Sequence, residues 1–321
     1  MTHTDELRLM AKIARLYYEH GLNQPEIATQ LDLSQATISR LLKRAQQEKI
    51  VRITVSAPSG IYTDLEEALQ KAFRLKAAIV VDCEQEDMDE YTLRNLGAAA
   101  AFYVESTIRR NEVVGVSSWS ASMLATIEAM RPLPRPLGAR VVQLHGGVGN
   151  PAAEAHANRL LNRLAALLHG EAKFLPAPGI VGSADAVPIL LADQFVQETM
   201  TLFDSMTLAL VGIGALEPSK FLASSGNIFS EAETHLLCSQ GAVGNICLRF
   251  YDADGAPVST PLNDRVLSMS RDQLRRVKRV VGIAGGRRKF EAIRGALRGN
   301  WINVLVTDRF MAERLVKEKD A

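Results

Sequence analysis

The 321-residue chain has few cysteines and no long apolar run. Its three cysteines are scattered without Cys-x-x-Cys spacing, which argues against a disulfide framework and favours a reducing compartment. The longest apolar runs are far shorter than the ~20 residues that span a bilayer, and the polar start lacks a signal-peptide profile. The six histidines show no zinc-binding spacing. These absences predict a soluble, cytoplasmic protein that needs no membrane and holds no metal.

The chain also has almost no net charge, because 37 Lys and Arg face 36 Asp and Glu. A net charge of +1 argues at first against a nucleic-acid partner. However, residues 34–52 contain one acid, Glu48, and the basic residues Arg40, Lys43, Arg44, Lys49 and Arg52. Basic side chains neutralise phosphates and supply much of the affinity for DNA. The neutral total therefore hides a basic segment, whose balancing acids lie chiefly in residues 64–90.

The length favours two domains, since one domain takes about 100–200 residues. Residues 5–48 are helical in pattern, and residues 50–55 alternate as a short strand. Pro58 and Gly60 then break the pattern, which predicts a domain of residues 1–57 and a second of residues 58–321.

The second segment is rich in Ala, Val and Gly, and its apolar strands alternate with helices. Strands are predicted at 77–82, 113–116, 140–144, 208–211, 280–283 and 303–306, and helices at 62–73, 90–110, 154–169, 187–202 and 289–297. This alternation is typical of an α/β domain with a largely parallel sheet. One hairpin is predicted, with a strand at 245–251 and an Asp-Gly turn at 252–255.

Residues 24–42 match the helix-turn-helix pattern. Ala28 stands where two helices cross, and Asp32 stands in the turn, where a left-handed backbone is needed. Ser34 is a good N-cap for the next helix, whose inner face has Ile38, Leu41 and Leu42. The predicted DNA contacts on this helix are Gln35, Thr37, Ser39, Arg40, Lys43 and Arg44. A helical bundle with ordinary surface charges is the alternative, and a following strand is also typical of a winged unit.

Residues 16–28 and 33–44 resemble the DNA-binding head of SorC-type (SorC/DeoR) bacterial transcriptional regulators. The resemblance continues through Gly115-Val-Ser-Ser-Trp-Ser120, Val142-Gln-Leu-His-Gly-Gly147, Leu175-Pro-Ala-Pro178, Leu210-Val-Gly-Ile-Gly214, Gly244-Asn-Ile-Cys247, Phe250-Tyr-Asp-Ala-Asp-Gly255 and Gly285-Gly-Arg-Arg-Lys-Phe-Glu-Ala-Ile293. The order and spacing of these markers carry the resemblance. It implies a Rossmann-like α/β domain, similar in fold to sugar-phosphate isomerases and deaminases, that binds a sugar or sugar phosphate and forms a tetramer.

Ligands of α/β sheets bind at the carboxyl ends of strands. The turn after the strand 113–116 offers hydroxyls and a helix start, which suit a phosphate or a polyol. Its predicted effector-binding residues are Ser117, Trp119, Ser120 and Ser122. The family commonly has Gly and Thr here, so Trp119 favours an apolar sugar face over a phosphate. A Ser-rich helix cap without a ligand is the alternative.

After the next strand, Gly146 permits a close backbone approach, and His145 is predicted to bond a sugar hydroxyl, with a structural role as an equal alternative. The resemblance implies two further effector residues. Asn245 matches a position that is usually acidic in the family, and Lys289 matches a lysine that contacts the ligand. Lys289 and the two arginines before it oppose the helix dipole, which favours an anionic ligand; surface solvation is the alternative.

An isomerase- or deaminase-like enzyme is the first competing hypothesis, because the implied fold is shared. Such proton transfer needs a positioned base, and Asn245 leaves no evident carboxylate pair. The glycine pairs complete no dinucleotide fingerprint, so no cofactor is expected. The second competing hypothesis is a constitutive DNA-binding protein, in which the C-terminal domain only forms the oligomer and senses no ligand. The sequence favours a regulator, not an enzyme. Its expected partners are operator DNA and a sugar, polyol or sugar-phosphate effector. It is also expected to bind further copies of itself and form a tetramer, or alternatively a dimer.

Overall fold

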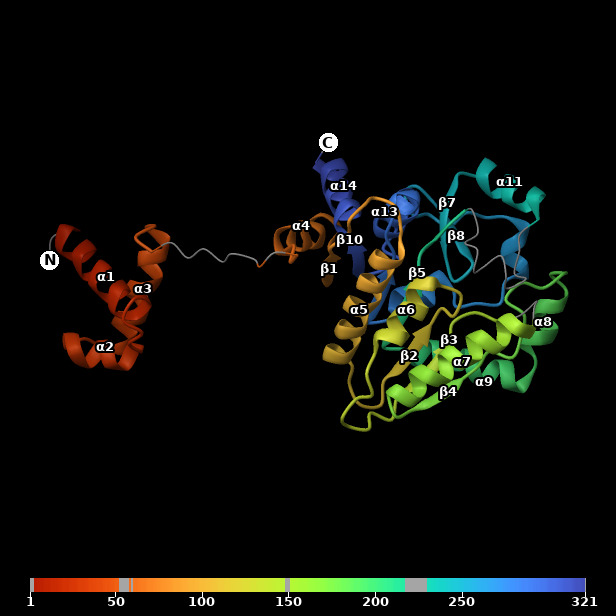
Figure 1. Ribbon diagram of the computed structural model, residues 1–321, viewed down its shortest axis with the longest axis horizontal. Coiled ribbons are helices and arrows are strands. Elements are labelled where there is room, and N and C mark those ends of the chain that lie inside the picture. Colours follow the sequence, from red (N-terminus) through yellow and green to blue (C-terminus); the bar gives the residue numbers. More distant parts are fainter. Residues whose placement is uncertain (1–2, 52–57, 59, 148–150, 217–229, 321) are drawn as a thin grey trace. The chain divides into compact units, whose positions relative to one another are not determined.

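The computed structural model describes residues 3–51, 58, 60–147, 151–216 and 230–320 (Figure 1). The chain forms two compact units, Met1–Pro58 and Ser59–Ala321. Of the strand predicted at residues 50–55, Ile50 and Val51 form a bend, and the rest lies outside the described residues, so the winged arrangement stays a prediction. No described helix is long and apolar enough to cross a bilayer.

The first unit contains the helices α1 (His3–Tyr18), α2 (Gln24–Leu31) and α3 (Gln35–Gln47). Their shared core is small and apolar, and it consists of Met10, Ile13, Ala14, Ile27, Ala28, Ile38, Leu41, Leu42 and Ala45. The predicted inner face of α3 is therefore confirmed. α2 begins with a capping box between Asn23 and Glu26.

The turn between α2 and α3 has the predicted helix-turn-helix geometry. Asp32 is left-handed, with φ 52° and ψ 46°, and its N–H donates to the carbonyls of the last turn of α2. Ser34 Oγ accepts a hydrogen bond from the N–H of Thr37 at 3.2 Å and so caps α3. The chain thus reverses within Asp32–Ser34 and places α3 across α2.

The backbone of Asp32 makes this turn sensitive to the shape of the residue. We expect Asp32→Gly to leave the melting temperature nearly unchanged, because glycine adopts φ near +52° without strain. Asp32→Val should destabilise the unit by about 1–2 kcal/mol, because a β-branched side chain is strained there. Urea unfolding measures the difference, and equal stability of the two variants would contradict the geometry of the turn.

The second unit is built on a parallel sheet of seven strands, in the order β1-β10-β9-β5-β2-β3-β4. The strands are β1 (Ala77–Val81), β2 (Val113–Val116), β3 (Arg140–Gln143), β4 (Glu171–Lys173), β5 (Leu208–Gly212), β9 (Arg279–Ile283) and β10 (Val304–Asp308). The α/β prediction is confirmed. Strand β4 was not predicted, since three residues give too short a pattern.

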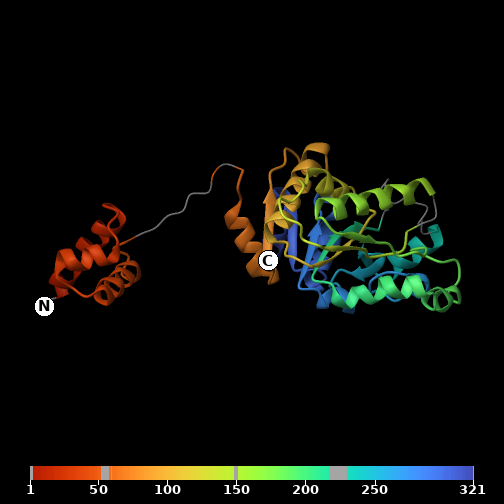
Figure 2. The same cartoon turned by 90° about the horizontal axis from the view of Figure 1, so that it is seen from below.

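Helices cover both faces of this sheet (Figures 1 and 2). α5 (Glu90–Thr107), α6 (Ala121–Ala129) and α7 (Pro151–Leu167) pack on one face, against strand residues such as Leu208 and Leu210. The alternate residues Ala209 and Val211 face the other layer. That layer contains α4 (Thr63–Phe73), α9 (Gln194–Thr201), α12 (Arg271–Arg276), α13 (Phe290–Arg298) and α14 (Arg309–Asp320). Successive residues of a strand point to opposite faces of the sheet. Because helices cover both faces, the residues on both are apolar.

Two predicted elements are wrong in detail. The single helix expected at 187–202 is two helices, α8 (Ala186–Leu191) and α9, followed by the 3-10 turn η1 (Leu202–Ser205). Asp193 causes the break, because its carboxylate accepts the N–H groups of Phe195 and Val196 and so starts a new helix.

The hairpin lies in a small antiparallel sheet of β6 (Gly214–Ala215), β7 (Ala242–Ile246) and β8 (Arg249–Asp252). Its turn is at Cys247 and Leu248, which have φ of 51° and 64°, so the strand predicted at 245–251 contains the turn. Asp252–Gly255 forms a second tight turn, in which the N–H of Gly255 donates to the carbonyl of Asp252.

The order of the large sheet reverses next to β2. From β2 the chain proceeds outward through β3 to β4, and β5 then returns to the opposite side of β2. Ligands of open parallel sheets bind at such a switch point, beyond the carboxyl ends of the strands. A ligand site is therefore expected at the loops after β2 and β5.

Candidate functional site

The outer face of α3 is polar and basic. Gln35, Ser39, Arg40 and Lys43 are exposed. Within the described part of the chain, Arg40 and Lys43 make no side-chain hydrogen bond or ion pair. These cations are thus available to phosphates and base edges.

Two other predicted DNA contacts have partners inside the first unit. The guanidinium of Arg44 bonds Glu6 of α1 and lies 2.8 Å from the carboxylate of Glu48, and these hydrogen bonds, Glu6 first, raise its pKa. The hydroxyl of Thr37 lies 2.8 Å from that of Ser34 in the cap of α3. Both residues therefore stabilise the unit, and a DNA contact by Arg44 has to compete with two carboxylates.

The predicted serine loop lies at the switch point. The N–H of Ser117 donates to the carbonyl of Leu210 at 3.0 Å, and its hydroxyl accepts the N–H of Gly212 at 3.0 Å. Ser117 and Ser122 are buried, and Trp119 is only 8% exposed. Ser120 precedes α6 without a side-chain cap, and its hydroxyl donates to that of Ser122 at 3.4 Å. The loop after β2 is thus fastened to the end of β5.

Two residues of this site, Gly212 and Gln143, were not predicted from the sequence. Gly212 is required because a Cβ there would lie 2.6 Å from the hydroxyl of Ser120. Gln143 ends β3, and its buried amide donates to the hydroxyl of Ser118 and accepts the N–H of Leu175. A glutamine within the apolar run 140–144 was the signal that could have found it.

Asn245 and the turn with Lys289 meet at the same segment. Asn245 of β7 pairs with Gly214 of β6. Gly214 comes two residues after Gly212, which bonds the serine loop. A Cβ on Gly214 would lie 2.6 Å from the amide nitrogen of Asn245. β6 also contacts α13 and the 3-10 turn η3 (Arg287–Lys289). Residues 212–215 therefore connect the serine loop, Asn245 and the turn that contains Lys289.

Lys289 differs from the two arginines before it. Burial lowers the pKa of its ammonium group to about 8, and Nζ has no hydrogen-bond or ion-pair partner among the described residues. Arg287 is exposed, and its backbone N–H donates to the backbone carbonyl of Glu86. Its guanidinium lies 4.0 Å from the side-chain carboxylate of Glu86. The α-helix begins at Phe290, one residue after the predicted start, and the three cations form the 3-10 turn that precedes it. Lys289 and Arg287 therefore lie in different environments.

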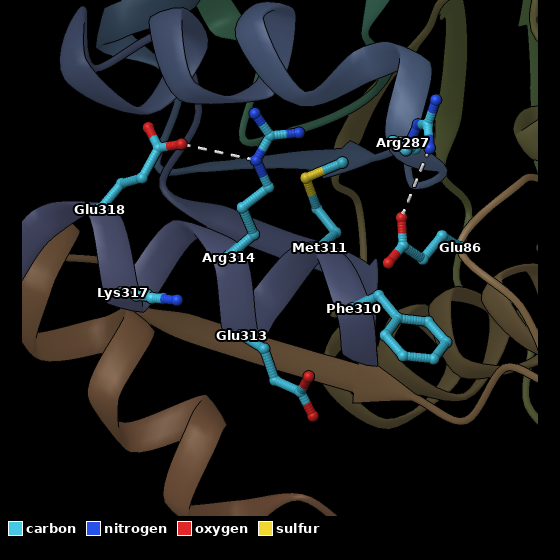
Figure 3. A pocket seen from close by; sticks show the side chains of 8 residues that line it. All are labelled: Glu86, Arg287, Phe310, Met311, Glu313, Arg314, Lys317 and Glu318. Atoms are coloured by element: carbon cyan, nitrogen blue, oxygen red, sulfur yellow. Dashed lines mark hydrogen bonds and ion pairs between the residues drawn. The ribbon is translucent and has the colours of Figure 1, made fainter.

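A cavity of about 500 Å³ lies on the Arg287 side of this turn (Figure 3). Its lining is mixed in charge and consists of Glu86, Arg287, Phe310, Met311, Glu313, Arg314, Lys317 and Glu318. Figure 3 shows that Arg287 faces Glu86 and that Arg314 lies beside Glu318. Nε of Arg314 is 3.4 Å from the carboxylate of Glu318. Three cations and three carboxylates line this cavity, and Lys289 is not among them, so its lining does not favour an anion.

His145 is buried in the loop after β3. Its Nδ1 lies 3.2 Å from the carbonyl oxygen of Gly146, its backbone pairs with Ser268, and burial lowers its pKa to about 4. The close approach that Gly146 permits is to the backbone of residues 177 and 178, since a Cβ would lie 2.4 Å from the carbonyl oxygen of Ala177. Both residues thus hold this loop in place and present a neutral imidazole.

The imidazole of His145 should stay neutral down to about pH 4, because charging it in its buried site is unfavourable. The unfolded chain takes up that proton near pH 6.5, so folding stability is complete above pH 6.5 and falls as the pH drops toward 4. NMR titration of the ring and acid unfolding measure both effects. His145→Asn should lack this part of the pH dependence, and a titration of His145 near pH 6.5 would contradict its burial.

Comparison with known proteins gives consistent matches along the chain. Residues 60–317 match the family model "Putative sugar-binding domain", and residues 10–48 match "Sigma-70, region 4". The deoxyribonucleoside regulator of Bacillus subtilis (strain 168) is 32% identical over 314 residues, which is 98% of this chain and 99% of that protein. The sorbitol operon regulator of Klebsiella pneumoniae is 32% identical over 324 residues, 99% of this chain and 100% of that protein. The crystal structure of full-length SorC, the sorbitol operon regulator from the same species, has a TM-score of 0.74 and 31% identity, and the match covers 97% of this chain and 99% of that one.

Proposed function

The chain belongs to the SorC/DeoR family of bacterial transcriptional regulators, and we propose that a sugar, polyol or sugar phosphate controls its affinity for an operator. Residues 1–57 are the DNA-binding domain, and residues 58–321 bind the effector and form the oligomer. One observation supports the proposed effector site most strongly. Residues 212–215, at the switch point of the sheet, connect the serine loop with Asn245 and with the turn that contains Lys289.

On DNA, two copies of α3 enter successive major grooves of a pseudo-palindromic operator. Arg40 is the main contact to bases, and Lys43 binds phosphate; both have free cationic groups on the outer face of α3 within the described chain. Gln35 and Ser39 add polar contacts near the start of the helix. Thr37 and Arg44 act mainly by holding α3 against α1 and its own cap.

In the effector site, Ser117, Ser120 and Ser122 supply hydroxyls, and Trp119 supplies an apolar wall. Asn245 offers one acceptor and two donors in place of a carboxylate. Lys289 binds the negative charge of an effector, because its desolvated ammonium group lacks a counter-ion among the described residues. His145 and Gly146 shape the floor of the site and contribute a neutral hydrogen-bonding group.

Effector binding favours one oligomer geometry and so changes the spacing of the paired heads. We propose a homotetramer, with a dimer as the alternative, that acts in the cytoplasm. The relatives are regulators by name, and the proposed effector residues include no carboxylate to act as a base. We therefore propose that the sugar-binding domain senses its ligand without converting it.

A thermal-shift screen of the full chain against sugars, polyols and their phosphates tests this function. At least one compound should raise the melting temperature, since a ligand that binds only the folded state stabilises it. Absence of any shift would contradict the sensing role and favour a constitutive DNA-binding protein. Each hit is then incubated with the protein and analysed by NMR, and turnover would support the enzyme instead.

A further inference from the structure

A second cavity, of about 410 Å³, lies between α8 and residues 263–268. None of the proposed effector residues lines it. One wall is apolar and contains Val187, Leu191 and Met200, while Arg249 and Asp264 also line the cavity. The volume falls within the range of small-molecule pockets.

Arg249 places a positive charge beside this cavity, and no described residue serves as its counter-ion. Its guanidinium donates to the hydroxyl of Ser268 at 3.0 Å and to backbone carbonyls of Asn263, Val266 and Ser268. All of these acceptors are neutral, and no carboxylate of the described chain lies within ion-pair distance of Arg249. Burial consequently lowers its pKa. An anion in the cavity would compensate this charge.

Asp264 supplies the opposite charge at the same cavity. It is exposed, and within the described residues its carboxylate makes no hydrogen bond or ion pair. Arg249 of β8 donates to the backbone carbonyl of Asn263, the neighbour of Asp264, so both charged groups line the cavity without forming an ion pair with each other. The cavity thus combines a cation, an anion and an apolar wall.

We propose that this cavity binds a free α-amino acid with an aliphatic side chain. The carboxylate of the amino acid binds Arg249, its ammonium group binds Asp264, and its side chain packs on Val187, Leu191 and Met200. Ser268 lines the cavity and pairs with His145 through the backbone. Occupancy is therefore communicated to the loop after β3, and the two ligands should change each other's affinity.

Calorimetric titration of the full chain with leucine tests the proposal. Two analogues separate the charges: 4-methylpentanoate lacks the ammonium group, and 3-methylbutylamine lacks the carboxylate. Leucine should bind, and each analogue should bind at least about tenfold more weakly. No binding of leucine, or equal binding of leucine and either analogue, would overturn the zwitterion site.

Variants at the exposed rim locate the binding without disturbing Arg249, which holds residues 263–268. Ala184 is exposed and lines the cavity, so Ala184→Trp should fill it and abolish leucine binding, whereas Ala184→Ser should not. Asp264→Asn should weaken leucine to the level of 4-methylpentanoate. The melting temperature of each variant confirms folding, and undiminished leucine binding by Ala184→Trp would place the ligand elsewhere and overturn the proposal.

Discussion

The Arg40→Ala variant is expected to lose operator binding while it keeps its affinity for the effector. Arg40 is exposed on the outer face of α3 and has no partner within the described chain. A bidentate contact from arginine to a base is worth about 1–3 kcal/mol. A dimer loses that contact at both half-sites, which is at least roughly a thirtyfold loss in affinity. Fluorescence anisotropy with the DNA upstream of the regulated operon measures the change.

Arg8→Ala provides the matched control. Arg8 is also an exposed arginine of the first unit, but it lies on α1, where it is 4.0 Å from Asp5. Its loss should change operator affinity only slightly. If Arg40→Ala also abolishes the effector-induced rise in melting temperature, the two domains are not separable in the way we propose.

The second large effect is expected at Lys289, where substitution should weaken the effector and spare the DNA. Hydrogen bonds to a charged group contribute about 1.5–3 kcal/mol, so Lys289→Met should bind an anionic effector roughly ten- to a hundredfold more weakly. Operator affinity without effector should be unchanged. Arg287→Met is the control, because Arg287 points to Glu86 and lines the other cavity. Equal losses in both variants would contradict the special position of Lys289.

The pH dependence of effector binding follows from the same residue. Lys289 has a pKa of about 8 in the folded chain because burial disfavours its charge. Below pH 8 the ammonium form dominates, and the affinity for an anionic effector should be constant. Above pH 8 the proton is lost and affinity should fall, by up to about tenfold per pH unit. Calorimetric titrations across this range measure the slope, and Lys289→Met should abolish it.

Local chemistry made much of the first unit predictable. Asp32 tolerates a left-handed backbone and Ser34 caps a helix, and both act within a few residues of their own position. The strands of the large sheet were predictable for a similar reason, since buried β-branched runs such as Val113–Val116 have a strong pattern. The hairpin turn was not, because neither Cys247 nor Leu248 is a residue type that favours positive φ.

The arrangement of the proposed effector residues could not be predicted from the sequence. The bond between Ser117 and Gly212 joins residues that are 95 positions apart, and it depends on β5 lying beside β2. No local pattern encodes that strand order. Burial of His145 has the same origin, because residues 267–269 cover the loop after β3. The position after strands gave the serine loop and His145 as candidates, and the resemblance gave Asn245 and Lys289, whereas the three-dimensional arrangement distinguished Lys289 from Arg287.

Control of DNA binding by the effector is tested by the operator affinity of the full chain with and without the compound that raises its melting temperature. This compound should change the dissociation constant for the operator by at least about tenfold, and Lys289→Met should require much more of an anionic compound for the same change. An operator affinity that stays constant at saturating compound, while the compound still binds, would contradict control of DNA binding by the effector.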